Sequence, residues 1–281
     1  MSCMRGQLSG ISGALRYLLL RREHLAKEDI EYVLNGLCKP IDRFGVLSFG
    51  VKSENIEGYL AARVQKSERL INCGFAHGVP GVLAILSLAW KSGFDSRSVR
   101  SAVQKLTDYL TEFVAEDEHG IGWPDARIYP EGTSTKIAMD AWCYGNAGIA
   151  RAIWLSSTAS RKKSDASVAR SAIHSAIRRE LSFQRLKTPW VCHGLAGLLL
   201  VLMRFYNDST DNLVGDGIDQ ITDRLLAQYE DGNLLGFADR AERGNPTNDV
   251  SLLNGATGVA LVLYSAATDL EPRWDALLGV S

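Results

Sequence analysis

The sequence has no excess of charge of either sign. Its 281 residues include 31 Lys and Arg against 32 Asp and Glu, which gives a formal net charge of −1 at pH 7. Proteins that bind nucleic acid or anionic membrane surfaces depend on a strongly positive surface potential. The composition therefore disfavours both kinds of partner.

Long apolar runs are missing as well. The longest extend over about ten residues and contain Gly or Ser, whereas a helix needs roughly twenty apolar residues to span a bilayer. The first six residues do not lead into the apolar core of a signal peptide. We expect no transmembrane segment and no secretion.

Cysteine is scarce and odd in number. With five cysteines, at least one has no partner within the chain, unlike the disulfide framework of a small secreted domain. No linker or low-complexity stretch divides the chain, and its 46% apolar residues are enough to bury a large core. We expect a cytoplasmic protein with reduced thiols, and a single domain over residues 1–281.

The chain does contain an internal repeat. A Gly-x-x-Gly frame occurs five times, and an apolar run follows each copy. Such a period holds two helices and their loops, so each unit is predicted to be a helical hairpin. The first glycines of the five frames, 49 to 68 residues apart, are Gly10, Gly78, Gly145, Gly194 and Gly255.

The two helices of each unit differ in pattern. The first is apolar nearly all round, as in residues 81–90, which is typical of a helix buried on most sides. The second is amphipathic, as in residues 96–116 and 167–183, where apolar residues recur at three- and four-residue steps. An inner ring of buried helices within an outer ring of amphipathic ones is an α/α toroid, and we predict this all-α fold.

Two of the repeats carry metal-binding side chains. Cys143 and Cys192 each stand two residues before the first glycine of a frame, and His193 follows Cys192. Two thiolates and an imidazole suit Zn²⁺ and leave one tetrahedral position open for a substrate. Free cysteine is also common in protein cores. Because equivalent helix starts can converge in space, the pattern favours a zinc enzyme with one Zn²⁺ per chain.

These motifs together resemble the lanthionine synthetase C-like family, whose members close thioether rings in lanthipeptides. The resemblance covers nearly the whole chain and follows the order of the family's motifs. It rests on residues 74–78 (Gly-Phe-Ala-His-Gly), 141–145 (Ala-Trp-Cys-Tyr-Gly), 192–194 (Cys-His-Gly) and 251–261 (Ser-Leu-Leu-Asn-Gly-Ala-Thr-Gly-Val-Ala-Leu).

The resemblance implies a zinc held by Cys143, Cys192 and His193. A cysteine thiolate of a dehydrated precursor peptide would add to dehydroalanine or dehydrobutyrine in the same peptide and form lanthionine or methyllanthionine. His77 aligns with the histidine that the family uses near the zinc, and its ordinary pKa suits a proton donor to the α-carbon. From the residue alone, a capping or packing role for His77 stays open. A lanthipeptide dehydratase is the implied partner enzyme.

Three features depart from the family pattern. Met139 stands where members usually carry an arginine, with Lys136 and Arg127 as possible substitutes, and Cys3 stands where they tend to carry an aspartate. The third departure is length, because the family's toroid is sevenfold and this chain shows five repeats. We expect about two hairpins to be missing at the N-terminus, which would expose the apolar sides of the inner helices at both edges of the ring.

Two other functions remain open. A zinc-binding scaffold for peptide or glutathione would tolerate the loss of the arginine. A prenyltransferase-like toroid enzyme also activates thiols with zinc, but it usually uses a carboxylate ligand, so the adjacent Cys192 and His193 favour the cyclase.

The remaining candidate residues follow from their local sequence. In the long loops we consider Trp123, Arg127 and Tyr129 as peptide contacts. We expect His24, His119 and His174 at the surface, and Cys3, Cys38 and Cys73 in the core.

Overall fold

The computed structural model describes residues 10–56, 68–129, 136–238 and 248–281, so Cys3 lies outside the described residues. The helices are α1 (Ile11–Leu20), α2 (Lys27–Phe44), α3 (Val79–Lys91), α4 (Arg97–Glu112), α5 (Asn146–Ser160), α6 (Lys163–Phe183), α7 (Leu195–Ser209), α8 (Asn212–Leu226) and α9 (Ala256–Ala266). The strands are β1 (Val51–Lys52), β2 (Arg69–Asn72), β3 (Ala115–Asp117), β4 (Gly120–Gly122) and β5 (Ala126–Tyr129). Short 3-10 helices cover Arg22–His24, Gly45–Phe49, Ser53–Asn55 and Trp274–Leu278.

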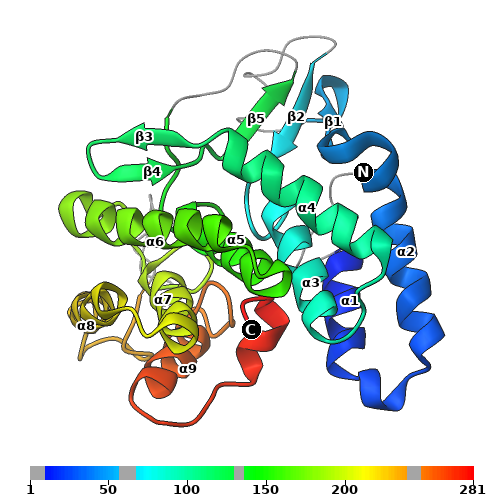
Figure 1. The fold of residues 1–281 in the computed structure, drawn as a ribbon. Coiled ribbons are helices and arrows are strands. Elements are labelled where there is room, and N and C mark those ends of the chain that lie inside the picture. The colour runs from blue at the N-terminus through cyan, green and yellow to red at the C-terminus, as the bar shows by residue number, and fades with distance from the viewer. Residues whose placement is uncertain (1–9, 57–67, 130–135, 239–247) are drawn as a thin grey trace.

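The five helices that follow the glycine frames form the inner layer. α1 contacts α3, and the contacts continue from α3 to α5, from α5 to α7 and from α7 to α9 (Figure 1). α3, α5 and α7 are buried over most of their length, α3 from Val79 to Ala89 without interruption. The predicted inner helices of an α/α toroid are confirmed.

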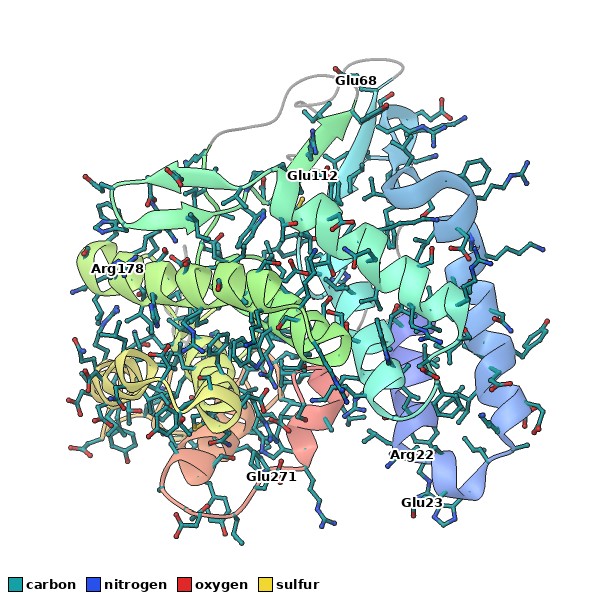
Figure 2. The ribbon with its side chains drawn as sticks, viewed as in Figure 1. Arg22, Glu23, Glu68, Glu112, Arg178 and Glu271 are labelled. Carbon is teal, nitrogen blue, oxygen red and sulfur yellow. The ribbon has the colours of Figure 1, made fainter. Side chains whose placement is uncertain are left out.

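The even-numbered helices form the outer layer and are amphipathic. α4 buries Val99, Val103, Leu106 and Leu110, one stripe at helical spacing, against the inner helices. Most charged side chains of the outer helices lie on their other faces, although α6 buries Asp165, Arg179 and Glu180. Figure 2 shows Arg178 of α6 at the edge of the molecule.

One predicted helix ends early. The helix expected over residues 96–116 ends at Glu112, because Ala115–Asp117 pairs instead with Gly120–Gly122 as an antiparallel hairpin. The turn of this hairpin includes Gly120, whose φ of +115° favours glycine. The hairpin packs on α6.

The segments between α2 and α3 and between α4 and α5 together form a second sheet. β1, β2 and β5 form an antiparallel sheet in that order, with Leu70 opposite Ile128. Figure 1 shows this sheet at the top of the molecule. Its central strand β2 ends at Asn72, five residues before His77, so the sheet leads directly into a glycine frame.

α1 and α9 differ from the other inner helices because each buries one side only. α1 leaves Tyr17 57% exposed, and α9 leaves Tyr264 58% exposed. Apolar surface on both helices agrees with the expectation of exposed inner-helix edges. Among the described residues, no helix is both long and apolar enough to cross a membrane.

Buried arginines tie the C-terminal segment, residues 272–281, to three inner helices. The Arg16 Nε of α1 donates to the Ala276 carbonyl oxygen (2.8 Å), and the Arg151 Nε of α5 donates to that of Val280 (2.7 Å). Arg204 of α7 forms a two-pronged ion pair with the fully buried Asp275, at 2.6 and 2.8 Å. The segment therefore joins α1, at the N-terminal end of the described chain, to α5 and α7.

We predict that Arg204→Met destabilises the fold by about 3 kcal/mol, because the variant leaves the buried Asp275 carboxylate without its main partner. The free energy of unfolding in urea measures this, with Arg273→Met at an exposed position as control. A loss within about 0.5 kcal/mol of the control, the range of ordinary surface changes, would show that Arg204 does not anchor the segment.

Candidate metal centre

A backbone hydrogen-bond ladder joins the loops that precede four inner helices. The Ala76 N–H donates to the Cys143 carbonyl oxygen (3.1 Å), Cys143 to Cys192 (3.1 Å), and Cys192 to Leu253 (2.8 Å). All four residues stand at the same position of the glycine frame, two before its first glycine. The ladder therefore places equivalent positions of successive repeats side by side, and two of these positions are cysteines.

Glycine permits the loops to turn this tightly. Gly145 has a φ of +142°, and a Cβ there would lie 1.9 Å from the Met139 carbonyl oxygen. A Cβ on Gly197 would lie 1.9 Å from the Val191 carbonyl oxygen. Any larger residue would push these loops away from the helix starts, and the cysteines with them.

The structure brings the three predicted ligands together. One donor atom each of Cys143, Cys192 and His193 lies within 4.8 Å of the other two. Cys143 is buried, Cys192 is half-buried and His193 is exposed, so the cluster is reached from the His193 side. Tetrahedral zinc sites use this donor set at bond lengths of about 2.0 to 2.3 Å, so the arrangement is compact enough for one ion.

The two thiols share a hydrogen bond and titrate unequally. The pKa of Cys192 is lowered to about 5, first by the hydrogen bond with Cys143 and then by the adjacent His193 and His77. The same hydrogen bond and burial raise the pKa of Cys143. The starts of α5 and α7 also lie just after the two cysteines, and the positive ends of helix dipoles favour thiolates.

His77 and Tyr144 lie beside the cluster. Both stand one residue before a frame glycine, the position that His193 holds in its own repeat. Their ring centroids are 6.1 Å apart, and His77 acts electrostatically on Cys192. The Tyr144 hydroxyl accepts a hydrogen bond from the Asn72 Nδ2 (2.7 Å). The rim thus carries an imidazole and a phenol next to the three candidate ligands.

The family model described as lanthionine synthetase C-like protein matches residues 6–278. The chain belongs to the lanthionine synthetase C-like family.

Two relatives illustrate the likeness. Nisin biosynthesis protein NisC of Lactococcus lactis subsp. lactis is 27% identical over 249 residues, which cover 82% of this chain and 56% of that protein. The solved structure of nisin cyclase superposes with a TM-score of 0.79 at 23% identity, over 98% of this chain and 66% of that one. The chain thus spans little more than half of the curated relative, and the structural likeness supports the α/α toroid.

In this lanthionine synthetase C-like chain, a buried polar network holds the loop before Cys143. Asp140 is fully buried, and its Oδ1 accepts from the Arg179 Nη1 (2.9 Å) and from the Asn146 Nδ2 (2.8 Å). Asn146 also accepts from the backbone N–H of Trp123 (2.7 Å). Sequence reasoning missed this network, although a lone Asp directly before the Ala-Trp-Cys motif and an Arg on the apolar side of an amphipathic helix were visible signals.

The predicted peptide contacts divide. Trp123 is wrong as a contact, because it is fully buried and its indole N–H donates to the Leu110 carbonyl oxygen (2.7 Å). Arg127 lies over the rings of Tyr109 and Phe113, and Tyr129 is exposed. Arg127 and Tyr129 stay predictions as peptide contacts.

Two side chains at and near position 139, where the family usually has arginine, are exposed, and two of the remaining cysteines are buried. Met139 is 41% exposed, and Lys136 is exposed in the same loop. Cys38 and Cys73 are buried, as predicted for core thiols.

The three background histidines also divide. His24 is exposed, as predicted. His174 is bound to Asp211 (3.0 Å) and His119 stacks edge-on against Phe183 at 4.6 Å, so neither is a free surface side chain. His174 lies on α6 and His119 in the turn between β3 and β4, and each side chain contacts a neighbouring element.

The buried Asp140 makes the free energy of unfolding depend on pH in a testable way. Burial raises its pKa to about 6, although Arg179 opposes the shift. An acid whose folded-state pKa lies above its unfolded value of about 4 binds more protons when folded, so the free energy of unfolding falls as pH rises from 4 to 6. Relative to Asp140→Asn, the wild-type chain should therefore lose about 2 to 3 kcal/mol of stability between pH 4 and pH 7.

Urea unfolding at several pH values measures this difference. Asp117→Asn is the matched control, because Arg179 lowers the pKa of Asp117 and the wild-type advantage should instead be lost as pH falls below about 4. Parallel curves for the wild type and Asp140→Asn would contradict the raised pKa.

Proposed function

We propose that the chain is a zinc-dependent lanthipeptide cyclase that forms lanthionine and methyllanthionine. The observation that carries the proposal is the convergence of Cys143, Cys192 and His193 at one rim, with His77 beside them. The family relationship and the likeness to a nisin biosynthesis protein support a dehydrated precursor peptide as substrate. A lanthipeptide dehydratase would supply that peptide.

The donor set fits Zn²⁺. Two sulfur ligands and one imidazole nitrogen match the preference of this ion, and three protein ligands leave room for a fourth from the substrate. The chemistry that Zn²⁺ supplies when bound at such a site is a lowered pKa for a thiol in the open position. Because Cys143 and Cys192 must stay reduced to serve as ligands, we place the reaction in the cytoplasm. We also propose that residues 1–281 form one domain.

The chain's own residues would handle the proton. The substrate thiolate adds to the β-carbon of the dehydro residue, and the π electrons of the Cα=Cβ bond move to the carbonyl oxygen. His77, half-buried at the rim, then gives a proton to the α-carbon. The S–Cβ and Cα–H bonds form while the S–H bond and the Cα=Cβ π bond are lost. The thiol proton passes to water when the thiolate forms, and His77 regains a proton from water, so no proton is gained or lost overall.

A zinc-binding scaffold for peptide or glutathione is the second candidate. Met139, 41% exposed in the loop before Cys143, favours it, because a thioether has no proton or charge to offer a developing enolate. Both candidates require the same metal site and differ in turnover.

We expect about one zinc per chain in the purified protein and its loss in Cys143→Ala and Cys192→Ala. Elemental analysis measures the metal, and Cys38→Ala is the matched control, because Cys38 is equally a free, buried thiol but lies outside the ligand cluster. Well-folded wild-type protein without zinc, or both variants with full zinc, would contradict the metal site.

We expect His77→Asn to keep its zinc and to lower kcat for cyclisation by about 10² to 10⁴, the usual contribution of a general acid. Mass spectrometry after thiol alkylation of a dehydrated peptide follows ring closure, and His24→Asn is the control at an exposed histidine. If the wild-type protein holds zinc but closes no ring, the scaffold replaces the cyclase. If His77→Asn keeps the wild-type rate, the proton donor is another group.

A further inference from the structure

Asn72, at the end of β2, uses both ends of its amide. Its Oδ1 accepts from the Gly74 backbone N–H (2.7 Å), and its Nδ2 donates to the Tyr144 hydroxyl (2.7 Å). An amide oxygen only accepts and an amide nitrogen only donates, so the Gly74 contact fixes the orientation of the side chain. The Tyr144 oxygen is therefore the acceptor in its contact with Asn72.

The Tyr144 side chain has little freedom in this position. Its ring lies against Gly74, where a Cβ would stand 2.7 Å from the Tyr144 Cδ1 and 2.9 Å from the Cys143 carbonyl oxygen. The ring is half-buried, and its plane makes an angle of 42° with that of the His77 ring at a centroid distance of 6.1 Å. With the ring held and one lone pair of the hydroxyl occupied, the hydroxyl proton must point away from Asn72.

We propose that Asn72 is a positioning residue that aims the Tyr144 proton at the reacting peptide. Tyr144 then donates a hydrogen bond to the substrate carbonyl oxygen on which negative charge develops during thiol addition. This inference rests on the proposed cyclase function. Tyr144 keeps its proton throughout, so the bonds made and broken are those of the cyclisation given above.

The placement of the three residues supports this role. Tyr144 directly follows the candidate ligand Cys143, and its ring centroid lies 6.1 Å from that of His77, so donor, candidate metal site and candidate acid share one rim. A preorganised donor directed at developing charge stabilises the transition state more than the bound substrate. Loss of such a donor lowers kcat and leaves KM nearly unchanged.

The variant Asn72→Asp tests the direction of the hydrogen bond. A carboxylate retains the acceptor for the Gly74 N–H but cannot donate to Tyr144, so the Tyr144 proton turns toward Asp. We expect kcat for cyclisation to fall about 10²-fold or more, as on removal of one oxyanion donor, with KM within about threefold of wild type. Tyr144→Phe should lose a similar factor, and zinc content should stay the same in both variants.

The double variant separates positioning from structure. If Asn72 acts through the Tyr144 hydroxyl, Asn72→Asp has no further effect in the Tyr144→Phe background, within about twofold. Asn35→Asp, which adds the same charge at an exposed position of α2, is the control and should keep the wild-type kcat. If the kcat of the double variant falls by the product of the two single losses, the inference is overturned and the cyclase function stays intact.

A second readout needs no turnover. In protein labelled with ¹³Cζ-tyrosine, the resonance absent from Tyr144→Phe belongs to Tyr144, and it should shift in Asn72→Asp but not in Asn35→Asp. An unmoved resonance would overturn the contact itself. Zinc-loaded wild-type protein that closes no ring would overturn the proposed function, and with it the purpose assigned to the contact, even if the resonance moves.

Discussion

The ladder of backbone hydrogen bonds from Ala76 to Cys143, Cys192 and Leu253 is the constraint on which the candidate centre depends. It places equivalent positions of successive repeats in one row, so that residues 49 to 67 apart in sequence become neighbours. Side chains at the ladder position meet one another, and those one residue later form the rim. The functional groups of the centre are therefore set by the residues at these two positions of each repeat, which precede the helix.

Much of this arrangement follows from local signals in the sequence. The glycine frames and the apolar runs after them predicted the inner helices, and the repeat itself predicted that Cys143 and Cys192 would converge. The rest depends on contacts that no local pattern encodes. Arg179 meets Asp140 across 39 residues and Asn72 meets Tyr144 across 72, each through one side chain whose direction is set by packing. Trp123 was misjudged for the same reason, because its loop folds back over α4 and buries the indole.

The buried charges show what the inner layer needs besides apolar contacts. Three arginines of the inner helices and Arg179 of α6 lie almost wholly inside the protein, each with carboxylate or carbonyl partners. Such pairs add little net stability compared with apolar residues of the same size, but loss of one partner is costly because it leaves a buried charge uncompensated. In this chain they hold irregular segments, the loop before Cys143 and residues 272–281, for which helix packing alone supplies no fixed position.

The attachment of residues 272–281 to α1 has a consequence for how the chain reaches its native state. Each helical hairpin is a local structure that can form within microseconds, yet Arg16 and Ala276 are separated by 260 residues. The entropy of closing so long a loop must be lost before that contact stabilises anything. Hairpins can thus assemble one after another during synthesis, whereas the contact between Arg16 and Ala276 forms only after residues 272–281 have been made. Until then the side of α1 that packs on this segment stays exposed, and exposed apolar surface of a partly folded chain favours aggregation.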